Sequence, residues 1–247
     1  MPTFVDKIGT AMAVVNNSLL KIYSRWVVAR WTPTFQQGIV SDIWNRSLAC
    51  STGVLHVGAH LGEEAATYEE QMIPGFHVEG DPKIFERLKS NLSQTKLQIP
   101  IFALVSDGTR DKSDFYRANN DGHSSSIFEL SKVGRDYFPD LELKSMGQFP
   151  TTTIDALIEE LEAIKKANLL VLDVQGAEHL VLKGATKSLH NFDLLRIEVS
   201  SPPVYSGAMD MHWIIEWLTK FGFISLFIPE PPFHGDLLFF RSSHEVG

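Results

Sequence analysis

The most constraining feature of the sequence is an apolar run, residues 53–57, that breaks into a glycine turn and then into a helical pattern. The turn contains Gly58 and Gly62, and the helical pattern covers residues 62–72. Glycine lets a ligand approach the backbone because it has no Cβ. The first N–H groups of the helix that follows are unpaired and available to a ligand. Strand, tight turn and helix in this order predict a cradle for a nucleotide-type cofactor.

A second apolar strand, residues 75–79, ends in the carboxylate of Glu79. In doubly wound α/β folds, an acid about twenty residues beyond the glycine turn binds the hydroxyls of a ribose. Asp81 and Pro82 come next, after Gly80, and predict a helix with Asp81 as N-cap and proline in the first turn. The second strand therefore adds a ribose-binding candidate to the cradle.

From residue 53 onward, apolar runs alternate with helical periodicity, which predicts a mostly parallel sheet with helices on both faces. Residues 169–174 are continuously apolar up to Asp173, as expected of a strand buried on both faces. The last two strands have too short a link for a crossover, so they should pair antiparallel. We predict an α/β protein with a seven-stranded, mostly parallel sheet and an antiparallel last strand. The expected strands are residues 53–57, 75–79, 100–105, 169–174, 194–199, 223–228 and 236–241.

Residues 108–150 interrupt this alternation. We expect an extended segment at 114–117, a turn at 119–122, and a long loop that continues to Pro150. A helix should then run from about residue 152 to 166. The unpatterned segments 1–50, 108–150 and 200–212 are the expected walls of a substrate pocket.

Residues 1–50 are expected to form a helical extension, separate from a main domain at 51–247. Asn17 and Ser18 can cap a helix, and Thr32-Pro33 should end it. The extension could be a cap on the main domain, a dimerisation or substrate-covering element, or a membrane-surface element.

Composition excludes several classes of protein. The formal net charge of -8 argues against nucleic acid as the main partner. Cys50 is the only cysteine, so neither an intrachain disulfide nor a cysteine zinc site can form. The sequence shows neither a signal peptide nor an apolar run of membrane-spanning length. We therefore expect a cytoplasmic protein.

Acidic residues or glycine turns thus end five successive strands, at the edge where an open α/β sheet binds its ligand. In this order the motifs resemble the class I S-adenosylmethionine-dependent methyltransferases, and most of all the FkbM family, which methylates hydroxyl groups. The resemblance covers about residues 53–240. Its most specific run is Leu172-Asp173-Val174-Gln175-Gly176-Ala177-Glu178, followed by Val181-Leu182-Lys183-Gly184-Ala185. Supporting pieces are residues 57–62, 79–88, 106–107, 124–126 and 196–199.

The resemblance implies a Rossmann-like class I methyltransferase fold and S-adenosylmethionine as the cofactor. It places the glycine turn against the methionine part, Glu79 on the ribose hydroxyls, and Ser106 and Asp107 near the adenine. The residues expected to bind the cofactor are His56, Gly58, Ala59, His60, Gly62, Glu79, Gly80, Asp81, Ser106, Asp107 and Asp173.

The sequence departs from the family pattern at four positions. The family usually has an acid at His56 and an asparagine at His60, so the contacts to the amino-acid end of the cofactor differ. Gly80 and Gln175 replace the more usual proline and glutamate. The acidic ligands themselves remain.

Methyl transfer to an alcohol benefits from a base that removes the hydroxyl proton as the new bond forms. Asp173, Glu198 and His123 are the candidate catalytic residues. Each has a structural alternative: Asp173 could cap the helix that follows it, Glu198 could pair with Arg196 or Lys183, and His123 could simply be solvated.

A metal-assisted variant would use Asp173, Glu198 and a water to hold Mg²⁺, which would polarise the hydroxyl. We expect no other metal site. His56 and His60 are four residues apart, but one lies in a strand and the other in a turn, so they do not share a helix face.

Three functions compete. The first is an O-methyltransferase acting on a hydroxyl of a small molecule or sugar-containing acceptor. The second, a nicotinamide-dependent oxidoreductase, lacks its pyrophosphate turn, because Gly58 and Gly62 do not make Gly-x-Gly-x-x-Gly. The third is a non-catalytic binding or assembly module that keeps the methyltransferase fold. A homo-oligomer formed through the N-terminal helices is a further expectation.

Overall fold

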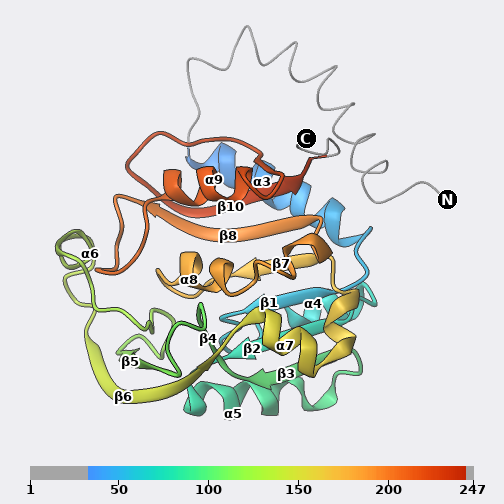
Figure 1. Ribbon diagram of the computed structural model, residues 1–247, viewed down its shortest axis with the longest axis horizontal. Coiled ribbons are helices and arrows are strands. Elements are labelled where there is room, and N and C mark those ends of the chain that lie inside the picture. Colours follow the sequence, from blue (N-terminus) through green and yellow to red (C-terminus); the bar gives the residue numbers. More distant parts are fainter. Residues whose placement is uncertain (1–32, 243–247) are drawn as a thin grey trace, which may run out of the picture. The chain divides into compact units, whose positions relative to one another are not determined.

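The computed structural model describes residues 33–242 (Figure 1). The chain divides into two units between Ser51 and Thr52. In the first unit, helix α3 (Pro33–Leu48) begins at the proline that we expected to end a helix. Proline suits the first turn of a helix because its missing N–H has no intrahelical partner there. The helix expected after Asn17 and Ser18 lies outside the described residues, and the two-domain division of the chain stays a prediction.

The second unit is built on a seven-stranded sheet with the strand order β3-β2-β1-β7-β8-β10-β9 (Figure 1). Five strands run parallel, and β10 is antiparallel to both of its neighbours, β8 and β9. The predicted α/β sheet with an antiparallel last strand is confirmed. The strands are β1 (Val54–Val57), β2 (Gly75–Glu79), β3 (Gln98–Phe102), β7 (Leu169–Leu172), β8 (Leu194–Ser201), β9 (Phe223–Ser225) and β10 (Phe233–Arg241).

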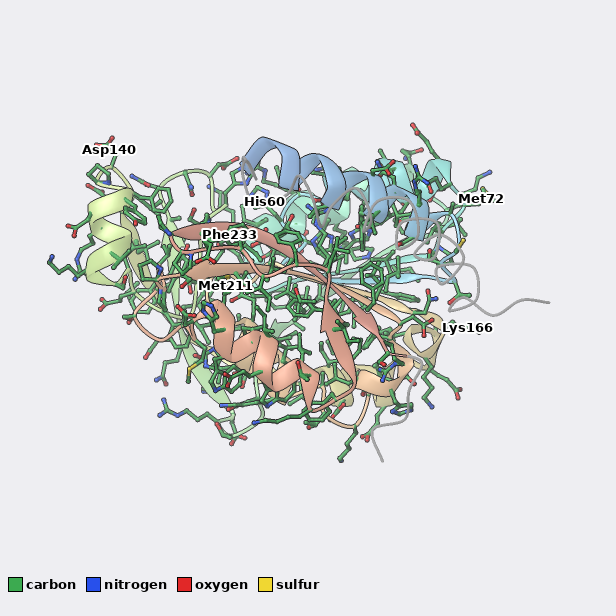
Figure 2. All side chains as sticks on the ribbon, turned by 90° about the horizontal axis from the view of Figure 1, so that it is seen from above. His60, Met72, Asp140, Lys166, Met211 and Phe233 are labelled. Carbon is green, nitrogen blue, oxygen red and sulfur yellow. The ribbon has the colours of Figure 1, made fainter. Side chains whose placement is uncertain are left out.

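Helices cover both faces of this sheet (Figure 1). The main core joins strand residues such as Leu55 and Leu170 to α7, α8 and α9 on one face. The turned view shows α9, which begins at Met211, on one side of the strands (Figure 2). A smaller cluster that includes Ala65 and Leu88 forms under α4 and α5 on the other face. The helices are α4 (Ala65–Glu70), α5 (Pro82–Asn91), α6 (Lys132–Tyr137), α7 (Ile154–Glu160), α8 (Glu178–Lys183) and α9 (Met211–Thr219), and the 3-10 helices are η2 (Leu92–Gln94), η3 (Glu162–Lys166) and η4 (Leu189–Asn191). None of the helices among residues 33–242 combines the length and apolar character that a bilayer crossing requires.

Two expectations about the segment between β3 and α7 are wrong. The single strand expected at 100–105 is split, because β4 (Leu104–Val105) leaves the main sheet and joins a three-stranded sheet in the order β4-β6-β5. The expected loop up to Pro150 contains α6 and the ten-residue strand β6 (Leu143–Thr152), which pairs antiparallel with β5 (Lys112–Ala118). No residue of β6 is fully buried, so the strand lacks the apolar alternation that identifies a strand from sequence. Likewise, the helix expected up to residue 166 is α7 followed by the short 3-10 helix η3.

The glycine turn after β1 is where the chain comes closest to a neighbouring strand end. Gly58 has a φ of +83°, and a Cβ there would lie 1.8 Å from the carbonyl oxygen of Asp173. The Asp173 N–H donates to the Val57 carbonyl at 3.1 Å, and the Gly58 N–H donates to the Val78 carbonyl at 2.9 Å. Only glycine fits a position with this φ and this little space, so the turn brings the ends of β1, β2 and β7 together.

We expect Gly58→Ala to lower the free energy of unfolding by about 3 kcal/mol or more, because it adds a backbone clash to an unfavourable φ. Gly147→Ala is the matched control, since Gly147 has a φ of +86° and nothing within 4 Å of an added Cβ. The control substitution should lower the free energy of unfolding by only about 1 kcal/mol. Denaturant unfolding of both variants measures the difference, and equal losses would contradict the close approach.

Candidate functional site

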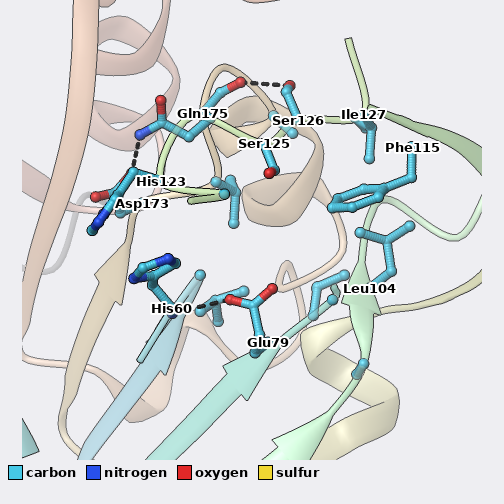
Figure 3. A pocket seen from close by; sticks show the side chains of 18 residues that line it. His60, Glu79, Leu104, Phe115, His123, Ser125, Ser126, Ile127, Asp173 and Gln175 are labelled. Carbon is cyan, nitrogen blue, oxygen red and sulfur yellow. Dashed lines mark hydrogen bonds between the residues drawn. The ribbon is translucent and has the colours of Figure 1, made fainter. Parts of the chain in front are cut away.

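A cavity opens at the carboxyl ends of β1, β2 and β7, the edge at which the sequence predicts a ligand (Figure 3). Six of the predicted site residues line it: Gly58, His60, Glu79, Gly80, His123 and Asp173. The other lining residues are Val57, Ala103, Leu104, Val105, Phe115, Gly122, Ser125, Ser126, Ile127, Val174, Gln175 and Ala177. They come from the end of β1, from residues 103–105, from the 108–150 segment and from the turn between β7 and α8.

The Glu79 carboxylate stands at the end of β2 and points into the cavity (Figure 3). The Asp81 N–H donates to its Oε1 at 2.7 Å, and the His60 N–H donates to its Oε2 at 3.0 Å. The residue is 9% exposed. Burial raises the pKa of Glu79 to about 7, although the two backbone hydrogen bonds favour the ionised form. Each oxygen keeps a lone pair for a ligand hydroxyl.

The two sides of the cavity differ in chemistry (Figure 3). One side is apolar and carries Leu104, Phe115 and Ile127. The opposite side carries the imidazoles of His60 and His123 and the carboxylate of Asp173, with Glu79 between the two sides in the view. The cavity therefore suits an elongated ligand with an apolar end, a central hydroxyl-bearing group and a polar end.

Gln175 links Asp173 to Glu198, two of the three predicted catalytic residues. Its Nε2 donates to Asp173 Oδ1 at 2.5 Å and to Glu198 Oε2 at 2.7 Å. One amide group therefore bridges the carboxylates of β7 and β8. Asp173 does not cap α8, whose N-cap is Ala177 and has no side-chain hydrogen bond, so that structural alternative for Asp173 is wrong.

The structural alternative for Glu198 was pairing with Arg196 or Lys183, and the basic side chain recorded beside its carboxylate is His234. Arg196 pairs with Asp236, with Nε 2.9 Å from Oδ2, and Glu198 lies 3.6 Å from Nε2 of His234. Burial raises the pKa of Glu198 well above its usual range, and the negative charges of Asp173 and Glu178 raise it further. Burial also raises the pKa of Asp173, against the lowering effect of the Gln175 hydrogen bond. The pair therefore holds protons more tightly than ordinary carboxyls do.

A second hollow begins on the other side of Gln175. Glu198, Ser200, Val204 and Tyr205 lie among its lining residues, so the end of β8 and the segment that follows it form part of its wall. The Tyr205 hydroxyl donates to Gln175 Oε1 at 2.8 Å. The bridge thus joins the wall of the first hollow, through Asp173 and Gln175, to the wall of the second, through Glu198.

Six predicted cofactor residues lie outside the cavity lining: His56, Ala59, Gly62, Asp81, Ser106 and Asp107. His56 lies within β1 and is buried at 4% exposure, with Nδ1 3.9 Å from a Glu64 carboxylate oxygen. Burial lowers the pKa of His56 well below its usual value. The departure from the family acid at this position is therefore a change in the sheet interior.

The remaining five have structural roles. Ala59 packs in the cluster beneath α4 and α5, and Gly62 lies against Leu88. Asp81 caps α5 as predicted, accepting from the Lys83 N–H at 2.8 Å, and also binds Arg117. Ala59, Gly62 and Asp81 therefore belong to the turns that carry His60 and Glu79.

Ser106 and Asp107 follow β4 in the chain. The Ser106 N–H donates to the Thr152 carbonyl, and Asp107 accepts from the N–H and hydroxyl of Thr109. The neighbouring residues Leu104 and Val105 line the cavity in their place.

Sequence reasoning missed the role of Gln175, which it treated as a mild departure, and that of Phe115 and Ile127. Gln175 has a φ of +54° and is followed by Gly176 at +98°, a turn that aims its amide at both carboxylates. The adjacent glycine was the available signal. Phe115 lies on β5, and Ile127 follows Ser126, which pairs with Tyr116 of the same strand, so both reach the cavity through contacts made outside the main sheet.

The methyltransferase FkbM domain matches residues 56–225 of this chain. The chain belongs to the FkbM methyltransferase family. Its strand order, with β10 antiparallel between β8 and β9, gives it the Rossmann-like class I methyltransferase fold. Methyl transfer is therefore the class of activity of this family member.

Comparisons with individual proteins are more distant. The 2-O-methyltransferase NoeI of Sinorhizobium fredii is 24% identical over 183 residues, which cover 70% of this chain and 74% of that protein. Fibrillarin from Aeropyrum pernix, solved with natively bound S-adenosyl-L-methionine, is 14% identical with a TM-score of 0.44, over 76% of this chain and 66% of its own. Magnesium protoporphyrin IX methyltransferase from Synechocystis is 8% identical with a TM-score of 0.40, over 94% of this chain and 96% of its own.

We expect Glu198→Gln to stabilise the protein at pH 8 relative to wild type and to have little effect near pH 4. A carboxyl whose pKa is raised in the folded protein does not change the free energy of unfolding below its unfolded pKa of about 4.3. As the pH rises from there towards the folded pKa, it lowers the free energy of unfolding by a growing amount. Denaturant unfolding across this pH range measures the difference. Glu86→Gln is the control at an exposed glutamate, and the same pH trend in both variants would contradict the assignment.

Proposed function

We propose that this protein is an S-adenosylmethionine-dependent O-methyltransferase that acts on a hydroxyl of a sugar-containing or small-molecule acceptor. The observation that carries the proposal is the Glu79 carboxylate, pointing into a cavity between an apolar side and a polar side. Membership of the FkbM family supports methyl transfer. The relative named a 2-O-methyltransferase supports an oxygen acceptor.

The chemistry of the cavity fits this cofactor. The apolar side, with Leu104, Phe115 and Ile127, suits a flat base, and the bridged Glu79 carboxylate suits the two hydroxyls of a ribose. Neither lysine nor arginine occurs among the residues that line the cavity, while Glu79 and Asp173 do. Such a site favours a ligand with positive charge, and S-adenosylmethionine carries a sulfonium.

When bound, S-adenosylmethionine supplies an activated methyl group for in-line displacement by an acceptor oxygen. We assign proton removal from that oxygen to the Asp173–Glu198 pair. Asp173 lines the first hollow and Glu198 lines the second, and carboxyls with raised pKa are stronger bases than ordinary ones. His123, the third candidate, lies on the cavity wall beside His60 and takes no part in this bridge.

The second hollow is the proposed acceptor site. Tyr205 and Glu198 form part of its wall and both bond to Gln175, so an acceptor hydroxyl there would face the bridge. Magnesium has no part in the proposal. Gln175 Nε2 donates to both carboxylates, and a donor group in that position opposes a cation between them.

Glu79→Ala should weaken S-adenosylhomocysteine binding by about 1–3 kcal/mol, because two ribose hydroxyls lose a charged acceptor. The wild-type affinity should also rise as pH goes from 6 to 8, since a carboxyl with a pKa of about 7 in the free protein must ionise to accept both hydroxyls. Titration calorimetry in EDTA measures both effects. Glu79→Gln should remove the pH dependence of the affinity, and the control Glu86→Gln should keep it. An unchanged affinity in Glu79→Ala would show that the ribose binds elsewhere.

The activity is tested by incubating the protein with S-adenosylmethionine and simple methyl glycosides, with S-adenosylhomocysteine release as the readout. Asp173→Asn and Glu198→Gln should each lower turnover by about 10²–10⁴-fold, the range for loss of a general base. The protein could instead bind S-adenosylhomocysteine but turn over no hydroxyl acceptor, while Asp173→Asn keeps full cellular function. That result would indicate a non-catalytic binding or assembly module.

A further inference from the structure

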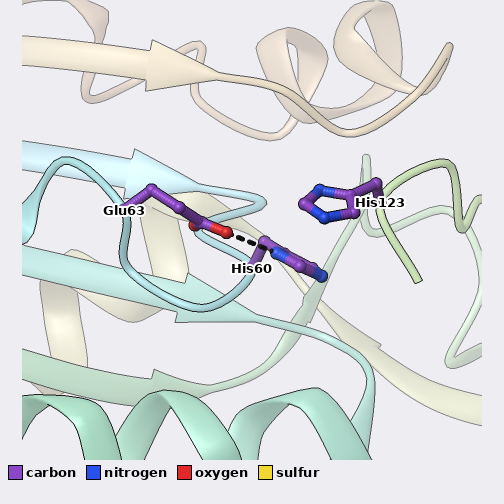
Figure 4. A group of neighbouring side chains, drawn as sticks. All are labelled: His60, Glu63 and His123. Atoms are coloured by element: carbon purple, nitrogen blue, oxygen red, sulfur yellow. Dashed lines mark hydrogen bonds and ion pairs between the residues drawn. The ribbon is translucent and has the colours of Figure 1, made fainter. Parts of the chain in front are cut away.

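Three side chains at the mouth of the cavity form a cluster of metal-ligand types: His60, Glu63 and His123 (Figure 4). Each offers one ligand atom, and these atoms all lie within 4.8 Å of one another. His60 and His123 also line the cavity, with ring centroids 3.9 Å apart. The proposed methyl-transfer mechanism uses none of the three side chains.

The cluster joins two turns that are distant in the sequence. His60 and Glu63 belong to the glycine turn after β1, while His123 follows the turn that contains Asp121 and Gly122. Both oxygens of Asp121 accept from Arg87 Nη1, at 2.8 Å each. The turn that carries His123 is therefore held to α5, and the approach of the two histidines does not depend on their own contact.

The His60 imidazole faces two hydrogen-bond acceptors, one at each ring nitrogen. Its Nδ1 lies 2.8 Å from Glu63 Oε1, and its Nε2 lies 3.1 Å from the Asp121 carbonyl oxygen. Both neighbours are acceptors, yet a neutral imidazole carries only one N–H. If Nε2–H donates to the carbonyl, the lone pair of Nδ1 faces a carboxylate, and a cation between the two relieves the repulsion.

We propose that His60 Nδ1, the Glu63 carboxylate and the His123 imidazole bind one divalent transition-metal ion of the Zn²⁺ kind. Two nitrogens and one carboxylate oxygen are a ligand set of catalytic and accessible zinc sites, with a fourth position left open. Ligands about 2.0–2.2 Å from one tetrahedral ion lie about 3.3 Å apart. The side chains of Glu63 and His123 are exposed, and binding would require them to rotate so that the three atoms move from their present separation to that distance.

The surroundings of His60 match those of a metal-bound histidine. Such a histidine almost always donates its second ring N–H to a carbonyl or carboxylate, which sets the tautomer. The Asp121 carbonyl is in that position. A bound ion would tie the glycine turn to the 121–123 turn, both of which contribute walls of the cavity. Because two ligands are imidazoles, Zn²⁺ and Co²⁺ should bind and Mg²⁺, which prefers oxygen, should not.

The competing arrangement is an imidazolium. Burial lowers the pKa of His60, but the hydrogen bonds to Glu63 and Asp121 outweigh it, so the pKa is raised overall. A charged His60 could donate to both acceptors and stack on His123 without any metal. The two arrangements differ in whether the protein binds a metal ion at this place.

The test titrates Co²⁺ into the full-length protein after EDTA treatment and removal of the chelator, and follows the ligand-field absorption of the ion. We expect one Co²⁺ per chain, displaced by Zn²⁺ and not by Mg²⁺. His123→Ala and Glu63→Gln should each weaken binding by at least about tenfold. His190→Ala, at an exposed histidine outside the cluster, should leave it unchanged.

Absence of the Co²⁺ absorption, or equal affinity in wild type and His123→Ala, would overturn the metal site and support the imidazolium. The readout needs neither cofactor nor acceptor. Binding of S-adenosylhomocysteine in EDTA tests the proposed function separately, so failure of either idea leaves the other standing.

Discussion

The close approach of the Gly58 backbone to the Asp173 carbonyl is the contact on which the rest of the site depends. It holds the carboxyl end of β1 against that of β7, while the Gly58 N–H binds β2 through Val78. Three strand ends are thereby brought to one edge, and their polar residues face a common space. The helices on either face of the sheet stabilise this arrangement but do not enter the cavity chemistry. A side chain larger than hydrogen at position 58 would separate the strands that carry Glu79 and Asp173.

The same edge concentrates buried negative charge. Glu178 illustrates how the fold tolerates it: its carboxylate accepts from the N–H groups of Val174 and Gly176, at 3.1 Å each, yet burial still raises its pKa to about 7. Glu79 is held in the same way by two backbone N–H groups. Hydrogen bonds from the turns thus keep the carboxyls in place, while desolvation keeps them basic. This combination suits a site that binds a cationic ligand and removes a proton, and it costs stability above neutral pH.

Much of the fold could be predicted from sequence because the central strands β1, β2 and β7 are buried at every position and are therefore mostly apolar. The antiparallel β10 followed from the short link before it, while the order of the strands came only from the structure. β6 could not be predicted, because a strand with no fully buried residue carries no hydrophobic period. Within the site, Glu79 and Asp173 were predictable because they end apolar strands. Ser106 and Asp107 were expected near the adenine, and the residues of β4 just before them, Leu104 and Val105, line the cavity.

By itself, the sequence determined the family, the alternation of strands and helices, and the acids at the strand ends, because a local periodicity or a short motif indicates each of them. Only the tertiary structure decided which of these residues meet. Gln175 bridges Asp173 and Glu198 from two different strands, and His123 reaches His60 and Glu63 across about sixty residues of chain. Contacts of that kind depend on how turns are held by distant partners such as Arg87, and no local pattern encodes them.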